Sequence, residues 1–354
     1  MKFKTQLFIS AIALISTTSF AQPAKISPND WSVFSENNDA ATLKDTVFLG
    51  KSCVKLDGKK QAIAIRKGSN YKNFMVEVDI AARVMSGIGF HVADNQNYQF
   101  LYFRPGYGGT QEAIQYIPIF NGALSWVLYN YPAYEKTADI KAMEWFHASL
   151  EVRGSIMKVY VNHSKAPQME IHLIDTDSKQ GAIMIRTMFG ESYYANMMMH
   201  ELPAELTDWE ISEQFPRKET LDLDPAAKSS SWTPVKADDA SIVNIAKYIK
   251  NPNGVVIAKT TLKADADKDG LLYFDFIGKL KVYLNGKELY YYEKAKLDRI
   301  FRGTETLILH LKKGDNELAF VTEGDATIFG KGFNAMGRAQ HQNWGFIAEL
   351  GNTR

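Results

Sequence analysis

Hydrophobic and polar residues alternate along many short segments of this chain. From about residue 47 to residue 212 apolar side chains recur at every second position. The segments with this pattern are 62–67, 73–84, 87–93, 98–105, 113–120, 124–131, 145–154, 156–162, 169–175, 181–188 and 193–202. Alternation with a period of two is typical of strands with one buried face, and Gly, Asn, Asp and Pro between them supply turns. Because helical periodicity is almost absent, the sequence predicts an antiparallel sandwich or jelly roll.

The clearest hairpin joins segments 145–154 and 156–162 through the turn Arg153-Gly154-Ser155. Alternation along its two strands leaves one apolar side. The residues on that side are Leu150, Val152, Met157, Val159 and Val161. We expect them in the core.

The alternating pattern stops between residues 213 and 236, a polar stretch with prolines and three consecutive serines. This composition predicts a linker or domain seam. Alternation then resumes in segments 254–264, 270–278, 279–293 and 306–324. Asn285-Gly286 predicts a tight hairpin turn, since both residues accept a positive φ. The predicted fold is all-β, with two tandem β-sandwich or jelly-roll domains at residues 22–212 and 237–354.

The first 21 residues predict a secretory signal peptide. Lys2 and Lys4 precede an apolar run from Leu7 to Ile15, and small residues end the segment at Ala21. This run is short for a bilayer span, and no other stretch approaches about 20 apolar residues. We therefore expect a secreted or periplasmic protein that does not insert into a membrane.

Composition removes several classes of function. The chain has 41 basic and 40 acidic residues and no basic run, so nucleic acid is not an expected partner. Its single cysteine, Cys53, cannot form an internal disulfide and is expected to pack as a small apolar residue. Phosphate-binding glycine loops and the GxSxG motif are absent, so no cofactor is expected.

Four segments carry a resemblance to a known superfamily: YQFLYFRPGYGG, EAIQYIPIFNG, WFHASLEVRGSIMKVYVN and GAIMIRTMFGESYYANMMM. Together they resemble the concanavalin-A-like, or laminin-G-like, sandwiches over residues 45–205, and most of all the secreted 3-keto-disaccharide hydrolase group. The later segments VYLNGKELY and LKKGDNELAF resemble the galactose-binding-like jelly rolls appended to many glycosidases. These resemblances imply two β-sandwiches and a function that involves carbohydrate.

The aromatic-rich segment 98–109 holds the candidate binding residues. Alternation places Tyr98, Phe100, Tyr102 and Arg104 on one face of a strand, opposite the apolar pair Leu101 and Phe103. Rings on the first face could stack on sugars, and a guanidinium could bind hydroxyls or a carboxylate. The predicted substrate-binding residues are Tyr102, Arg104, Tyr107, Gln115, Tyr116, Trp126 and Tyr129. The alternative is that these rings fill the sandwich and that Arg104 forms a structural cation–π pair.

Glu112 and His91 are the candidate acid and base, because one lies near Arg104 in sequence and the other on the proposed groove side of its strand. A second carboxylate pair, Glu77 and Asp79, is similar to the Glu-x-Asp-x-x-Glu motif of family 16 glycoside hydrolases. Ala82 stands where that motif has its last acid. We interpret Glu77 and Asp79 as part of an exposed sheet face.

The segment DADKDG resembles the start of a calcium loop, with Asp265, Asp267 and Asp269 at alternate positions. Phe276 occupies the position of the usual bidentate acid, so an EF-hand is excluded. A hairpin with solvated carboxylates is the main interpretation, and a weak structural calcium site is the alternative. The histidines show no zinc spacing.

The sequence therefore favours a secreted carbohydrate-active protein that binds a glycan or small glycoside and, in one hypothesis, hydrolyses it. One alternative is a non-catalytic carbohydrate-binding or protein-interaction module, favoured by the missing carboxylate pair. A further alternative is a polysaccharide lyase. In that case Tyr102 or His91 would act as the base while Arg104 and Gln115 neutralise a uronate.

Overall fold

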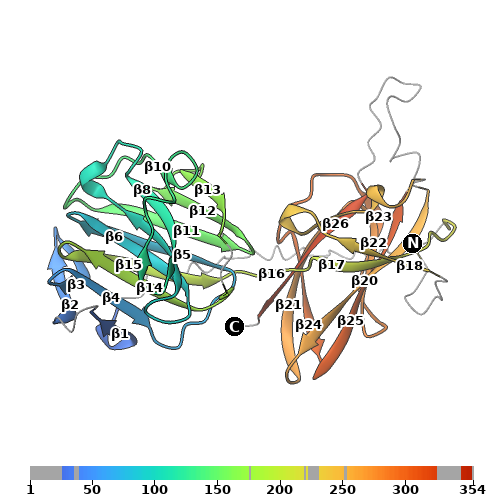
Figure 1. Cartoon of the computed structure of the whole chain (residues 1–354). Coiled ribbons are helices and arrows are strands. Elements are labelled where there is room, and N and C mark those ends of the chain that lie inside the picture. Colours follow the sequence, from blue (N-terminus) through green and yellow to red (C-terminus); the bar gives the residue numbers. More distant parts are fainter. Residues whose placement is uncertain are drawn as a thin grey trace, which may run out of the picture. The chain divides into compact units, whose positions relative to one another are not determined.

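A computed structural model describes residues 26–35, 40–174, 177–218, 221, 231–250, 253–324 and 344–352. Strands dominate this part of the chain, and its helices are four short 3₁₀ turns: η1 (Pro28–Asp30), η2 (Pro105–Tyr107), η3 (Asp239–Ser241) and η4 (Ile245–Lys247). The all-β prediction is confirmed (Figure 1). The predicted signal peptide, residues 1–21, lies outside the described residues. No described helix is both long and apolar enough to cross a bilayer.

The first sandwich is built from two antiparallel sheets that we call sheet A and sheet B. Sheet A has the order β1-β4-β14-β6-β7-β8-β10, with β9 beside β8, and sheet B has the order β13-β12-β11-β5-β15-β3-β2. The strands of sheet A are β1 (Trp31–Phe34), β4 (Gln61–Arg66), β6 (Met85–Val92), β7 (Tyr98–Phe103), β8 (Ile114–Phe120), β9 (Ala123–Leu124), β10 (Glu135–Lys136) and β14 (Ala182–Met188). Those of sheet B are β2 (Ala41–Phe48), β3 (Lys51–Gly58), β5 (Phe74–Ala82), β11 (Phe146–Arg153), β12 (Ile156–Val161), β13 (Met169–His172) and β15 (Ser192–Glu201).

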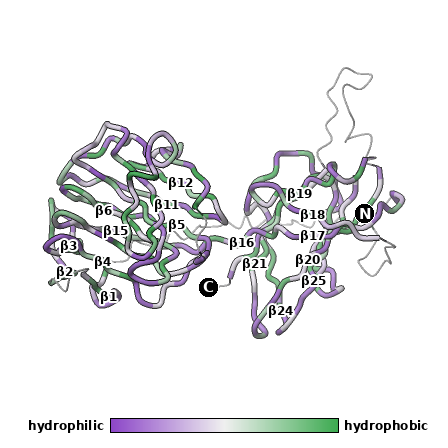
Figure 2. Tube along the Cα trace, viewed as in Figure 1, coloured by the Kyte–Doolittle hydropathy of each residue, from purple (hydrophilic) through white to green (hydrophobic). Residues whose placement is uncertain are grey.

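The core of this sandwich lies between the two sheets. The rings of Phe103 on sheet A and Phe146 on sheet B meet there at 5.2 Å between centroids. All five apolar hairpin residues named above are at most 3% exposed, so that prediction is confirmed. Cys53 is also buried, and burial raises the pKa of its thiol. Figure 2 shows the underlying alternation as green and purple along the strands.

Segment 124–131 is not the strand that alternation predicted. Only its first residue belongs to β9, and turns follow from Trp126 to Leu128. Val127 and Leu128 are 62% and 75% exposed, whereas Leu124 and Tyr129 are partly buried, so the stretch does not alternate between a buried and an exposed face. The prediction was wrong because apolar residues that alternate are not always packed; here the chain forms an exposed loop.

The second sandwich begins earlier than the sequence indicated. One compact unit comprises the chain up to Asn70, Met75–Leu150 and Lys158–His200, and the other comprises Tyr71–Phe74, Glu151–Met157 and the chain from Glu201 onward. Strand β17 (Asp208–Ser212) pairs with β18 (Trp232–Lys236). The chain after residue 212 therefore returns to β18, the sheet neighbour of β17, within the second sandwich.

We call the two sheets of the second sandwich sheet C and sheet D. Sheet C has the order β16-β26-β21-β24 with β19 beside β26, and sheet D has the order β18-β17-β20-β25-β22-β23. The remaining strands are β16 (Ala204–Glu205), β19 (Ile242–Asn244), β20 (Gly254–Ala264), β21 (Lys268–Phe276), β22 (Gly278–Leu284), β23 (Lys287–Lys296), β24 (Glu305–Leu311), β25 (Gly314–Gly324) and β26 (Gly345–Asn352). Its core contains the clustered rings of Trp209, Phe274, Phe320 and Phe346.

The Asn285-Gly286 turn joins β22 to β23 as predicted, with φ of 51° and 77°. We expect Gly286→Ala to lower the free energy of unfolding by about 1 kcal/mol, because a Cβ disfavours this left-handed backbone. Gly106→Ala is the control, since Gly106 has no left-handed φ and its added Cβ would meet nothing closer than 3.6 Å. Urea unfolding compares the two; equal midpoints would contradict the prediction.

Candidate functional site

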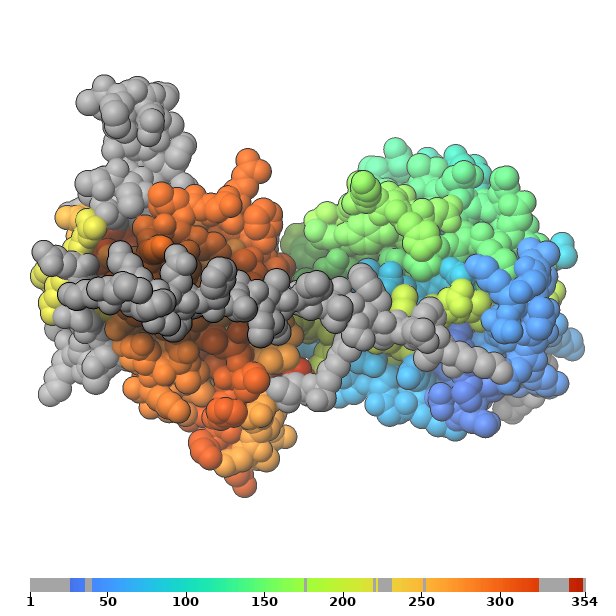
Figure 3. All heavy atoms as spheres, turned by 180° about the vertical axis from the view of Figure 1, so that it is seen from behind, coloured from blue at the N-terminus to red at the C-terminus, as the bar shows by residue number. Residues whose placement is uncertain are grey.

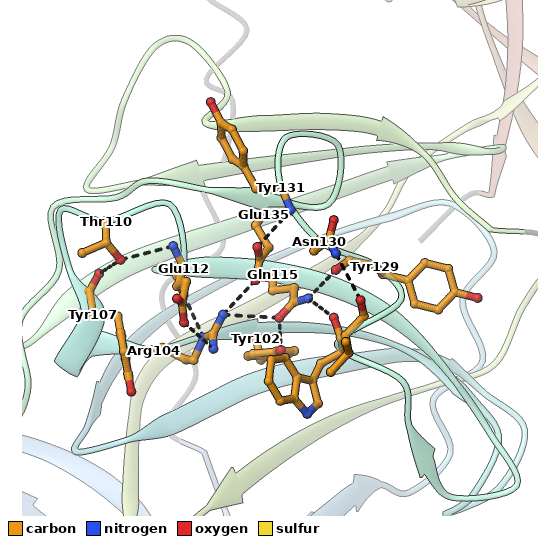
Figure 4. Close-up of polar contacts among 12 residues, drawn as sticks. Tyr102, Arg104, Tyr107, Thr110, Glu112, Gln115, Tyr129, Asn130, Tyr131 and Glu135 are labelled. Carbon is orange, nitrogen blue, oxygen red and sulfur yellow. Dashed lines mark hydrogen bonds and ion pairs between the residues drawn. The ribbon is translucent and has the colours of Figure 1, made fainter.

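Arg104 follows the last residue of β7 and is only 8% exposed. Its Nε donates to the main-chain oxygen of Glu112 at 2.8 Å, and its Nη1 lies 3.0 Å from the Glu112 carboxylate. Its Nη2 donates to Glu135 Oε1 at 2.9 Å and to Gln115 Oε1 at 3.4 Å. Each guanidinium nitrogen thus has an acceptor within the protein (Figure 4).

Gln115 links this arginine to the loop that follows β9. Its side chain is fully buried, its Oε1 accepts a hydrogen bond from the Tyr102 hydroxyl, and its Nε2 donates to the carbonyls of Trp126, at 2.8 Å, and Tyr129. These bonds satisfy main-chain oxygens of a segment that no strand partner covers. Burial also raises the pKa of Tyr102, which favours its neutral, hydrogen-bonding form.

Glu135 completes the network, and it was missed in the sequence analysis. One carboxylate oxygen accepts from Arg104 and the other from the main-chain N–H of Tyr131 at 2.9 Å. Glu135 stands opposite Gln115 in the short pairing of β10 with β8. No local pattern marks a two-residue strand, so this partner depends on how the loop returns to the sheet.

The rings beside Arg104 partly fit each of the two interpretations of this segment, a sugar-facing surface and a structural cation–π pair. Its guanidinium lies 5.7 Å from the centroid of Tyr102 and 5.4 Å from that of Tyr107. Tyr102 is buried, whereas Tyr107 is 49% exposed. Arg104 is therefore a structural cation–π and ion-pair centre whose outer neighbour reaches the solvent.

Three aromatic side chains held by this network point to solvent, and we call Tyr107, Trp126 and Tyr131 the aromatic platform. They are 49%, 49% and 53% exposed. The Glu112 side chain, which contacts Arg104, is 41% exposed. The platform is thus a set of accessible rings on two loops that a buried polar network fixes in place.

The groove expected along β7 is filled. The faces of the strand are as predicted, but Tyr98 and Phe100 are at most 3% exposed within an apolar layer on the outer side of sheet A. Leu124 and Tyr129 pack against this layer. Alternation gave the correct face, but it did not reveal that a loop covers it.

Tyr116 does not belong to the aromatic platform. It pairs with Leu101 in the register of β8 with β7, so it shares the face that packs between the sheets. It is fully buried, and its hydroxyl donates to Gln99 and accepts from the main-chain N–H of Ile174 at 2.9 Å. The prediction of a substrate contact is wrong because neighbouring residues of a strand face opposite sides.

His91 and Glu112 are not brought together. His91 is buried at an irregular step in β6 pairing, with φ of 47°, and follows Phe90, which pairs with Gln99. Glu112 contacts Arg104, which lies five residues after Gln99, the partner of Phe90. At a strand rise of about 3.3 Å per residue, this separation from His91 is about 16 Å along the sheet. One acid–base pair cannot be formed from these two side chains in this arrangement.

The three aspartates of the calcium candidate each engage a different basic group. Asp265 lies 2.9 Å from Lys268 Nζ, Asp267 accepts from the Lys312 ammonium and the Lys313 N–H, and Asp269 contacts His310 Nδ1 at 2.7 Å. Hydrogen bonding to these partners lowers the pKa values of Asp265 and Asp267. Within the described ranges no group of three potential metal-ligating side chains converges.

A depression of about 640 Å³ lies on sheet D of the second sandwich. Its charges largely pair with one another. Lys236 contacts Asp208, Lys259 lies 3.7 Å from Glu210, and the Lys259 ammonium also covers the Trp232 ring at 3.8 Å. The aromatic platform therefore remains the better candidate for ligand contact.

No family model matches this chain, and no curated protein matches it. Similar solved structures include the carbohydrate-binding module CBM66 from Bacillus subtilis, with 15% identity, 49% of this chain, 96% of that chain and a TM-score of 0.39. A protein with a galectin-like fold from Bacillus subtilis has 10% identity, coverages of 49% and 90%, and a TM-score of 0.37. The VIP36 exoplasmic/lumenal domain, in a form bound to Ca²⁺ and Man3GlcNAc, has 11% identity, coverages of 52% and 89%, and a TM-score of 0.37. These are likenesses of fold, and they assign no ligand to this chain.

Proposed function

We propose that this protein binds glycans through the aromatic platform of its first sandwich, as a protein exported from the cytoplasm. The observation that carries the proposal is the half exposure of Tyr107, Trp126 and Tyr131 on loops that a buried hydrogen-bonded network holds. Exposed rings offer apolar faces for sugar C–H groups, and the partly exposed Glu112 carboxylate at Arg104 can accept hydroxyl hydrogen bonds. Because the network fixes the loops beforehand, little ordering entropy opposes binding.

The proposal favours a binding module over the two enzymatic alternatives at this site. Hydrolysis by Glu112 and His91 would require the two groups at one bond. A lyase would require Arg104 to neutralise a uronate, but Glu112, Glu135 and Gln115 already occupy its nitrogens. The resemblance to 3-keto-disaccharide hydrolases suggests that oxidised disaccharides belong in the ligand panel beside neutral and acidic glycans.

We expect Trp126→Ala to weaken glycan affinity about tenfold, because loss of one stacked ring costs about 1.4 kcal/mol. Its indole is 49% exposed, so folding should be little affected. Isothermal titration calorimetry would measure the affinity for the glycan that the wild-type chain retains from the panel. Activity assays for reducing ends and unsaturated uronates would be run on the same samples.

Phe189→Ala is the matched control, because Phe189 is another exposed ring of the same unit, at 61%, outside the platform. It should bind as the wild type does. If Trp126→Ala and the wild type bind the glycan with equal affinity, Trp126 is not part of the glycan site. The proposal would be wrong if the wild-type chain bound none of the glycans in the panel.

A further inference from the structure

A second cluster of reactive side chains lies on the outer face of sheet B. On β11, the Ser149 hydroxyl lies 3.3 Å from His147 Nε2, and on the neighbouring β5 the Asp79 carboxylate lies 2.8 Å from His147 Nδ1. The order serine, imidazole Nε2, imidazole Nδ1 and carboxylate is the arrangement that activates a serine nucleophile. Three side chains of two adjacent strands thus form a hydrogen-bonded relay.

Asp79 is fixed as an anion by donors from both sides. Lys51 Nζ on β3 and Asn196 Nδ2 on β15 reach its second oxygen at 2.6 and 2.8 Å. Burial acts to raise the pKa of Asp79, but the hydrogen bonds from His147, Lys51 and Asn196 outweigh it and hold that pKa well below its ordinary value. The ionised Asp79 carboxylate accepts a hydrogen bond from His147 Nδ1, and His147 Nε2 faces the Ser149 hydroxyl on the other side of the ring.

This arrangement corrects the interpretation of Glu77 and Asp79 as a solvated sheet face. Asp79 is only 8% exposed, because side chains from the strands on both sides of β5 (β11, β15 and β3) contact it. Glu77 is more open, with a side chain 24% exposed and a carboxylate 3.8 Å from His147 Nε2. The polar side of β5 is therefore one wall of an organised cluster.

The relay itself is largely buried, and aromatic and partly exposed side chains lie at its edge. Ser149 is 6% exposed, and the Lys51 side chain 40%. His163 stacks on His147 at 3.9 Å, and the Lys51 ammonium lies 5.2 Å from the Trp145 ring. In Figure 3 atoms coloured as β5 and β15 lie between those of the green β12–β13 region and the blue β2–β3 region. The relay strands are thus in the middle of the sheet.

We propose that Ser149, His147 and Asp79 form a hydrolytic site for esters of short acyl groups. The inference stands on the geometry of sheet B and is independent of glycan binding by the aromatic platform. Its substrate class follows from the chemistry of the relay, which activates a hydroxyl toward a carbonyl carbon. Because Ser149 is only 6% exposed, a short acyl group is favoured over a bulky one.

The reaction balances with water as the second reactant. Ser149 Oγ attacks the ester carbonyl carbon while its proton moves to His147 Nε2. The bond to the alcohol oxygen then breaks, and Nε2 returns the proton to the departing alcohol. Water next attacks the acyl-serine and gives a proton to Nε2, after which that proton restores the Ser149 hydroxyl and the carboxylic acid leaves. Asp79 stays ionised throughout and stabilises the imidazolium.

The test uses the full chain with 4-nitrophenyl acetate as substrate and a fluorophosphonate probe for activated serines. We expect turnover by the wild type and probe attachment to Ser149, located by peptide mass spectrometry. Ser149→Ala should lower kcat at least about 100-fold and abolish labelling. Asp79→Asn should lower kcat while it leaves KM nearly unchanged, because Asp79 orients the imidazole.

Ser192→Ala is the matched control. Ser192 is a buried serine of the same sheet whose hydroxyl donates to Thr187 and not to a histidine. It should retain activity and labelling. Circular dichroism would confirm that each variant is folded. The proposal is overturned if the wild type neither turns over the ester nor takes up the probe, or if Ser149→Ala hydrolyses as fast as the wild type.

Discussion

Replacement of Arg104 by methionine is expected to lower the free energy of unfolding of the first sandwich by about 3 kcal/mol. The substitution removes the cation but leaves Glu135, which is 6% exposed, and Gln115, which is fully buried. A buried carboxylate without its cation is far more costly than the loss of a surface ion pair. The effect should therefore exceed that of any change at the exposed rings.

A double-mutant cycle separates two costs: that of a buried Glu135 carboxylate without its cation, and that of lost packing. Glu135→Leu in the Arg104→Met background should recover a large part of the lost stability, because both buried charges are then absent. Denaturant unfolding measures the free energies, and hydrogen exchange of the peptide that spans residues 121–136 localises the change. If Arg104→Met unfolds at the wild-type midpoint, the guanidinium network does not hold the loop.

The second large effect is expected in the second sandwich, where Lys296→Met should cost about 3 kcal/mol at pH 7. Asp275 on β21 is fully buried and accepts hydrogen bonds from the Lys296 ammonium and from the main-chain N–H groups of Phe276 and Phe301. Methionine has a similar length but cannot neutralise the carboxylate. The stability cost thus arises from Asp275, not from lost volume.

This cost should depend on pH in a defined direction. Burial acts to raise the pKa of Asp275, but the hydrogen bonds from Lys296, Phe301 and Phe276 outweigh it and lower that pKa. The ionised form therefore stabilises the wild-type fold above the ordinary aspartate pKa of about 3.9, and this contribution is lost as the pH falls through the lower folded value. The difference between wild type and Lys296→Met should be largest at pH 7 and smaller near pH 4.

Lys268→Met is the matched control for this prediction. Lys268 makes the same kind of contact, 2.9 Å from Asp265, but the two side chains are 44% and 87% exposed. Solvent screening should keep its effect well below that of Lys296→Met. Urea unfolding at both pH values gives all the free energies. Equal destabilisation by the two substitutions would show that burial of Asp275 is not the source of the effect.

Local sequence was sufficient for the strands and their faces. Alternation placed Leu101 and Phe103 toward the core, and it placed the apolar side of the β11–β12 hairpin there as well. The Asn285-Gly286 turn was predictable because its left-handed φ values restrict the residues that fit. These features depend on a few neighbouring residues, so the sequence by itself determined them.

The sites depended on which strands lie side by side. His147 and Ser149 share the polar face of β11 by alternation alone, but only the pairing of β11 with β5 brings Asp79 to them. Glu135 likewise meets Arg104 only because its loop returns to β8. A period of two fixes the side to which a residue points and not the strand that becomes its neighbour. The sequence thus determined an all-β chain and the faces of its strands, and the tertiary structure decided which charges are buried and which reactive groups meet.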